Sequence, residues 1–137
     1  MPGARSRAVP LDAVDDVVQV SDSEITATKL VHAGDPYLEG HYPDFTIYPG
    51  VFIMESVNQT VDAYVARTFG ADRIADLTTV TSARFTSPVL PGDTLQVTCK
   101  LVVQDDGLDV DAKCRNALGA TAARLKLAYR IKDGGIR

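Results

Sequence analysis

Hydrophobic and polar positions divide the chain into strand-like segments on either side of one helical segment. β-Branched residues are dense over residues 14–20 and 25–31, and the polar stretch SDSE between them is typical of a turn. The pattern therefore predicts an N-terminal hairpin. Residues 33–50, AGDPYLEGHYPDFTIYPG, are rich in glycine, proline and aspartate and predict a loop.

The helical segment covers residues 51–69, which contain neither glycine nor proline. Its spacing of three to four residues is that of a helix face and is seen in Met54, Val57, Val61, Tyr64, Val65 and Thr68. Pro49-Gly50 precedes the segment and Gly70 follows it, as is typical of helix ends. Such a helix would be about 28 Å long, enough to cross a small domain.

Strand-like segments fill the rest of the chain. The sequence predicts strands at residues 77–85, 94–103, 108–115 and 120–131, joined by a stiff SPVLPGD turn and by short DDG and ALG turns. Four strands with hairpin-length links predict an antiparallel meander. The whole order predicts an α+β fold, in which a curved antiparallel sheet of about six strands wraps around one long central helix.

Composition narrows the class of protein. The 137 residues suit one domain, and we expect a loose tail over residues 1–9 and a single domain over residues 10–137. The net charge of -4, with interspersed signs, argues against nucleic acid as a partner. The chain start lacks the apolar region of a signal peptide, and no apolar run is long enough to predict a membrane span.

The two cysteines, Cys99 and Cys114, lie in predicted strands. They form no CxxC motif, and no His-rich spacing accompanies them. We therefore expect buried free thiols, no metal site and a cytoplasmic location.

His41 lies in the proline-stiffened part of the predicted loop, GHYPDFTIYPG. Backbone groups alone could satisfy a histidine in such a loop. An imidazole titrates close to neutral pH, however, and Pro43 and Pro49 restrict the backbone around it, so a general base is the alternative. His32, the other histidine, falls in a polar turn at a strand end, and we assign it a structural role.

Glu55 stands just inside the predicted helix. Asn58, Gln59 and Asp62 follow it on the same helix face, which could be a plain solvated stripe. If the sheet covers the other side of the helix, this stripe faces water, a partner subunit or a substrate channel. In a partly apolar cleft, desolvation would let Glu55 hold a proton near neutral pH and donate it.

Gly50 stands where the predicted helix begins. It suits a plain turn. A glycine at a helix start also lets backbone N–H groups point outward at the positive end of the helix dipole. These groups could bind an anion or a polarised carbonyl oxygen.

Taken together, these residues resemble the 3-hydroxyacyl-acyl-carrier-protein dehydratase family, which has the hot-dog fold. The matching stretches are GHYPDFTIYPGVFIMESVNQT at residues 40–60 and ARFTSPVLPGDTL at residues 83–95, with fainter matches in PLDAVD and KLVHAGDPYLEGH. Their order and spacing fit nearly the whole chain. The resemblance implies an enzyme that dehydrates carrier-bound 3-hydroxyacyl thioesters to trans-2-enoyl thioesters in fatty acid or polyketide-type biosynthesis.

The resemblance also implies roles for the candidate residues. His41 matches the base that takes the C2 proton, and Glu55 matches the acid that helps the 3-hydroxyl leave as water. The backbone N–H of Gly50 matches the donor to the thioester carbonyl, and Gln59 matches a supporting position. We expect no cofactor besides the phosphopantetheine arm of the substrate, and a substrate pocket formed by Tyr42, Asp44, Phe45, Thr46 and Phe52.

Two partners follow from the resemblance. An acyl carrier protein would deliver the substrate, and a second copy of the chain would form a dimer that shares His41 and Glu55 between its subunits. Because carrier proteins are acidic, binding one would need a local basic patch on this acidic chain. The candidates are Arg67, Arg73, Arg84, Arg115 and Arg124.

Asp44 and Thr46 depart from the family, which usually has glycine and proline at these positions. Asp44 adds a negative charge close to His41, which would favour imidazolium and weaken a base. Asn58 also replaces a small residue. These departures indicate an altered substrate pocket. They keep two alternatives open: another thioester activity, such as hydrolysis or isomerisation, and a non-catalytic subunit that pairs with a second hot-dog chain.

Overall fold

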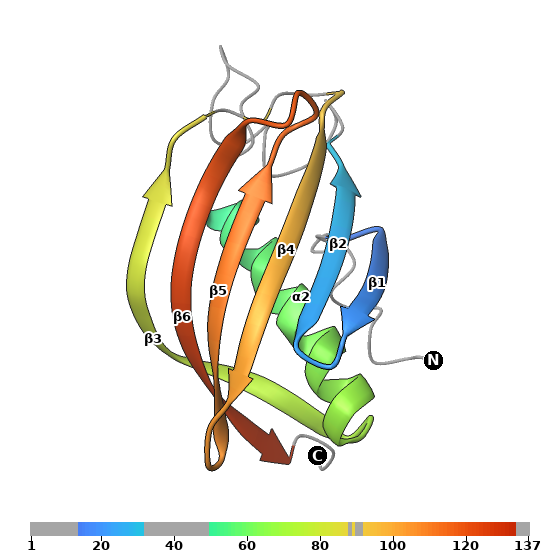
Figure 1. Ribbon diagram of the computed structural model, residues 1–137, viewed down its shortest axis with the longest axis vertical. Coiled ribbons are helices and arrows are strands. Elements are labelled where there is room, and N and C mark those ends of the chain that lie inside the picture. Colours follow the sequence, from blue (N-terminus) through green and yellow to red (C-terminus); the bar gives the residue numbers. More distant parts are fainter. Residues whose placement is uncertain (1–13, 32–49, 88, 90–91, 134–137) are drawn as a thin grey trace.

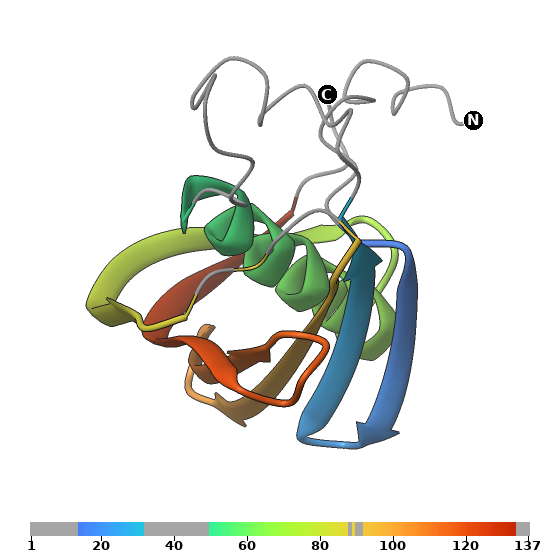
Figure 2. The ribbon, with the colours of Figure 1, turned by 90° about the horizontal axis from the view of Figure 1, so that it is seen from above.

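A computed structural model describes residues 14–31, 50–87, 89 and 92–133. In this part of the chain, one sheet curves around one long helix (Figure 1; Figure 2). The elements are β1 Asp16–Ser21, β2 Glu24–Leu30, α2 Gly50–Phe69, β3 Arg73–Phe85, β4 Thr94–Val103, β5 Gly107–Arg115 and β6 Thr121–Asp133. The predicted α+β architecture, with six antiparallel strands, is confirmed.

The strand order is β1-β2-β4-β5-β6-β3. The predicted four-strand meander is therefore wrong for its first strand, because β3 pairs with β6 at the edge of the sheet and not with β4. β3 also begins at Arg73, earlier than predicted. Two register shifts, between Leu77 and Thr79 and between Val80 and Ser82, interrupt the alternation of inward and outward residues along β3. A periodicity argument therefore does not detect the full length of this strand.

α2 lies against the concave face of the sheet, as Figure 2 shows, and its apolar side forms the core with that face. The buried apolar residues of α2 include Phe52, Ile53, Val57, Val61, Tyr64 and Val65. Burial of one such side chain contributes about 1.5–3 kcal/mol. Thr68, at the end of the predicted stripe, is exposed.

Three buried residues of α2 keep hydrogen bonds for their hydroxyl groups. Ser56 Oγ donates to Phe52 O over 3.1 Å, and Thr60 Oγ1 donates to Ser56 O over 2.8 Å. The Tyr64 hydroxyl donates to Asp22 O over 2.6 Å and so joins α2 to the β1–β2 turn. These bonds remove the cost of burying an unpaired polar group.

Cys99 and Cys114 are free and buried, as predicted. Burial raises the pKa of the Cys114 thiol to about 12 and raises the pKa of Cys99 as well. Both thiols therefore stay protonated and unreactive at neutral pH. None of the described helical segments is long and apolar enough to span a membrane.

Candidate active site

The polar stripe of α2 packs beside β3 and β6 and is not simply solvated. Glu55 and Asn58 are half-buried. The Tyr129 hydroxyl on β6 donates a hydrogen bond to Asn58 Oδ1 over 2.5 Å, and the Ala75 N–H on β3 donates to Asp62 Oδ1 over 2.9 Å. This helix face therefore borders the edge of the sheet that ends in β3.

Glu55 is oriented by a neighbour one turn along the same helix. The side-chain amide of Gln59 donates to Glu55 Oε2 over 3.1 Å. A carboxyl group held at one oxygen can keep or transfer a proton in a fixed direction. The structure thus brings together two residues that the sequence selected.

The charges along the stripe influence one another. Desolvation raises the pKa of Asp62, and the nearby Glu55 raises it further, while the hydrogen bond from Ala75 N–H acts to lower it. Burial also raises the pKa of the Tyr129 hydroxyl, with Cys99, Asp62 and Glu55 adding to the shift. Tyr129 therefore keeps its proton at neutral pH, which suits its role as donor to α2.

α2 begins at Gly50. The N–H groups of a first helical turn have no partner within the helix, and they lie at the positive end of its dipole. No acidic side chain in the first turn of α2 neutralises that end. The start of α2 can therefore bind an oxygen on which negative charge develops. Phe52, a predicted pocket residue, is buried in the core of this chain.

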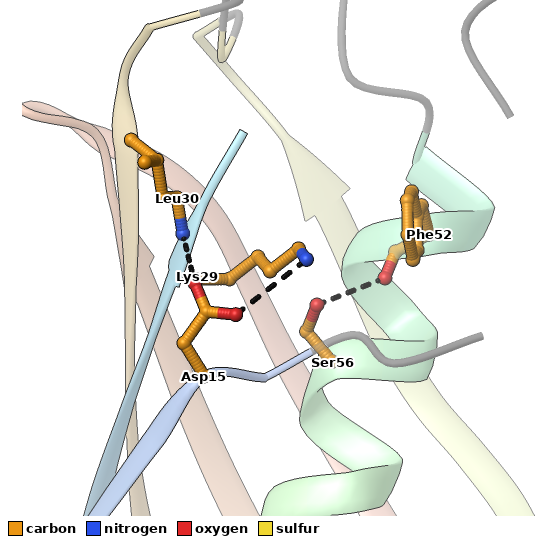
Figure 3. A network of polar contacts seen from close by, with 5 residues as sticks. All are labelled: Asp15, Lys29, Leu30, Phe52 and Ser56. Carbon is orange, nitrogen blue, oxygen red and sulfur yellow. Dashed lines mark hydrogen bonds and ion pairs between the residues drawn. The ribbon is translucent and has the colours of Figure 1, made fainter. Parts of the chain in front are cut away.

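A polar network fixes the end of β2, from which the chain continues toward His41. Asp15 Oδ2 accepts the Leu30 N–H over 2.7 Å, and Asp15 Oδ1 lies 3.6 Å from Lys29 Nζ. Lys29 is buried, and its side chain extends from β2 toward α2 near Ser56 (Figure 3). Strand periodicity carries no signal for this lysine, because Lys29 simply continues a strand.

Five of the predicted site residues lie outside the described residues: His41, Tyr42, Asp44, Phe45 and Thr46. Their roles stay predictions. Sequence reasoning also missed Tyr129, which contacts Asn58 from 71 positions away. Within the ranges that the structure describes, no group of three His, Cys, Asp or Glu residues could hold a metal ion.

Known proteins resemble this chain over most of its length. The sequence model of the ApeI-like family, described as ApeI dehydratase, matches residues 17–123. The chain is also similar to the 3-hydroxyacyl-[acyl-carrier-protein] dehydratase FabZ of Polynucleobacter necessarius subsp. necessarius. The identity is 36% over 131 residues, which are 92% of this chain and 86% of the relative.

Solved structures share the arrangement of sheet and helix. The dehydratase heterocomplex ApeI:P from Xenorhabdus doucetiae has a TM-score of 0.73 at 18% identity, covering 90% of this chain and 84% of that one. A thioesterase superfamily member from Thermus thermophilus has a TM-score of 0.68 at 14% identity, covering 85% and 86%. Likeness at such low identity shows the fold alone, and it confirms the predicted hot-dog fold.

Proposed function

We propose the function of this protein from its family, because the chain belongs to the ApeI-like dehydratases. It is a dehydratase that acts on 3-hydroxyacyl chains carried on acyl carrier protein and forms the trans-2-enoyl thioester. The observation that supports this most directly is the Glu55–Gln59 pair, on a helix whose first turn carries no acidic side chain. Fatty acid or polyketide-type biosynthesis is the setting that such a reaction serves.

In the proposed reaction, His41 removes a proton from C2 of the substrate. The negative charge that develops on the thioester oxygen is stabilised by the backbone N–H of Gly50. The bond from C3 to the hydroxyl then breaks while Glu55 gives that hydroxyl a proton, so water leaves and a C2–C3 double bond forms. Gln59 holds Glu55 in position. Transfer of the proton from His41 back to Glu55 through solvent restores the site.

In this proposal, the substrate arrives covalently attached to a carrier protein. Acyl carrier protein, which carries the substrate of the FabZ relatives as their name states, presents the chain on a phosphopantetheine arm, so the enzyme needs no further cofactor. The buried free thiols fit a reducing compartment, and we place the enzyme in the cytoplasm.

A second copy of the chain along β3 is part of the proposal. β3 is 13 residues long, and β6 is its single neighbour in the described sheet. Val80 and Phe85 lie opposite the buried Leu127 and Ala123, so they face the side of the sheet that holds α2. They are nevertheless 46% and 48% exposed. A partner would cover them and would complete each site with residues of both subunits.

Two other functions remain as defined alternatives. The relative from Xenorhabdus is a dehydratase heterocomplex, so a different hot-dog chain could replace the second copy and leave this one a non-catalytic subunit. Thioester hydrolysis or isomerisation is the other alternative, since a thioesterase superfamily member has the same fold.

Incubation with a 3-hydroxyacyl chain on acyl carrier protein tests the proposal, with the product identified by mass spectrometry. We expect a 2-enoyl product, and we expect Glu55→Gln to lower kcat at least about a hundredfold, as for a positioned acid. Asp105→Asn, which removes an exposed carboxylate in the turn between β4 and β5, is the control. Release of free thiol without enoyl product would identify a hydrolase. No turnover until a second hot-dog chain is added would identify a subunit.

A further inference from the structure

The outer face of the sheet carries three cations directly opposite one another on neighbouring strands. Lys113 on β5 pairs in register with Arg124 on β6, and Arg124 pairs with Arg84 on β3. Ala123 and Leu125, on either side of Arg124, are buried in the core. Because strand residues alternate between faces, the three cations lie on the face away from α2. We call Lys113, Arg124 and Arg84 the cationic row.

The cationic row lacks the charge balance of the row beside it. That row alternates in sign from β2 to β6: Glu24, Lys100, Asp111 and Lys126. Like charges directly opposite one another destabilise a sheet. Among the described residues, the one ion pair of the cationic row joins Arg124 to Asp111 over 3.7 Å, and both side chains are largely exposed. Such a pair stabilises little, so the row keeps an excess of positive charge.

A shallow hollow of about 380 Å³ lies on the same face. Its charged lining residues are Glu24, Lys100, Asp111, Lys113, Arg115 and Arg124. Four cations and two acids give the hollow a formal excess of two positive charges on a chain whose net charge is -4. A local field of this kind attracts an acidic partner and orients it during approach.

The cationic row also lies at the end of the sheet near which α2 begins. Arg84 is next to the last residue of β3, and Arg124 is close to the first residue of β6. Figure 1 shows these two strand ends on the same side of the molecule as the start of α2. A partner on the row would therefore lie at the same end of the molecule as the start of α2, on the opposite face of the sheet.

We propose that the cationic row, together with Arg115, is the docking surface for the acidic carrier protein, an inference that rests on the proposed function. Of the five arginines considered from the sequence, the structure separates Arg67 and Arg73 from this surface. Arg67 is in the last turn of α2, and Arg73 is at the opposite end of β3 from the row. A carrier is favoured over nucleic acid because the excess of positive charge is limited to the cationic row and Arg115 on a chain whose net charge is -4, whereas a long polyanion needs an extended basic stripe.

Charge reversal at Lys113, and separately at Arg84, tests the surface. Lys113→Glu and Arg84→Glu each place opposite charges beside Arg124, so both variants should unfold at the temperature of the wild type or higher. Arg73→Glu makes the same change in net charge at the far end of β3 and is the matched control. The substrates are one 3-hydroxyacyl chain on acyl carrier protein and the same chain on N-acetylcysteamine.

For each variant, we compare kcat/KM for the carrier substrate with kcat/KM for the short thioester. We expect each charge reversal in the row to lower the ratio of the first value to the second by about tenfold, as for an interface charge that steers association. The Kd for labelled carrier should rise by a similar factor, and Arg73→Glu should change both by less than about twofold. Equal effects of Lys113→Glu and Arg73→Glu would overturn the proposal, and so would tighter binding of duplex DNA than of carrier.

The failure of the docking surface and the failure of the proposed function can be told apart, because carrier binding is measured without turnover. A chain that binds carrier through the row but performs no dehydration would refute the proposed function and leave the docking surface in place.

Discussion

At the residue scale, the direction of the Glu55 carboxyl group depends on one amide of its own helix. Gln59→Leu removes the donor to Glu55 Oε2 and keeps a side chain of similar size. Because a small misplacement of a reacting group is costly, we expect kcat to fall about ten- to a hundredfold while KM changes little. Steady-state kinetics on carrier-bound substrate measure both constants. Gln104→Leu, in the exposed turn between β4 and β5, is the control, and an unchanged kcat in Gln59→Leu would show that the amide positions nothing.

A second residue-scale contact joins the helix to the sheet. The Tyr129 hydroxyl and Asn58 Oδ1 form a partly buried hydrogen bond. We expect Asn58→Ala and Tyr129→Phe each to lower the free energy of unfolding by about 1–3 kcal/mol, because each leaves a polar group without its partner. The double variant should lose less than the sum of the two, by about 1 kcal/mol. Urea denaturation measures this cycle, and strictly additive losses would mean that the bond contributes nothing.

Sequence reasoning reached some of these residues and not others for a physical reason. Glu55 and Gln59 are one helical turn apart, so periodicity alone put them on one face. The contact of Tyr129 with Asn58 could not be predicted, because it depends on which strand lies beside α2. The role of His41 rests on the family resemblance.

At the element scale, Asp62 links α2 to β3 through the Ala75 N–H. Its pKa is raised above the ordinary value of 3.8, so the folded state holds this proton more tightly than the unfolded chain. The resulting stabilisation is complete below that ordinary pKa and is lost as the pH rises through the raised pKa. Asp62→Asn keeps an oxygen acceptor and removes the charge.

We therefore expect Asp62→Asn to gain stability relative to wild type as the pH rises from well below 3.8 to neutral. Urea denaturation across that range gives the difference between the two proteins at each pH. Asp109→Asn, an exposed aspartate on β5, controls for the loss of one charge. A difference that does not vary with pH would contradict the raised pKa.

The start of β5 depends on a close approach to the backbone of β6. The sequence predicted Gly107 as a turn residue, but it is the first residue of β5, and a Cβ there would lie 2.5 Å from Tyr129 O. Because that atom is backbone, Gly107→Ala must push β5 away from β6, and we expect a loss of about 1–3 kcal/mol. Thermal and urea unfolding measure the loss. Ala117→Gly, an exposed change in the next hairpin, is the control, and full stability of Gly107→Ala would show that the strands separate freely.

The sequence predicted most elements but misplaced β3 in the sheet. Hairpin neighbours are predictable because a short turn leaves the next strand no other partner. The SPVLPGD connection after β3 is longer than the other turns, and it lets β4 lie beside β2 while β3 pairs with β6. Local patterns carry no information on such a choice.

At the scale of the whole molecule, this choice leaves apolar surface beside α2. Val80 and Phe85 face the core side of the sheet and are still about half exposed. The fold class was predictable, because one amphipathic helix and an antiparallel sheet have few ways to bury their apolar faces. The uncovered surface was not, because it exists only when β3 is the edge strand. An edge strand of 13 residues is a natural place for a second chain to pair.

Co-expression of two inactive variants tests whether each site is shared between subunits. In a mixed dimer of a His41→Ala chain and a Glu55→Gln chain, a shared arrangement leaves one site without both groups and the other site with both. Random pairing makes about half of the dimers mixed, so we expect about a quarter of wild-type activity per chain from a symmetric dimer. Enoyl formation by the co-expressed pair measures this, and each variant expressed alone gives the background. If both groups of a site come from one chain, every site carries a defect and the mixture stays at that background.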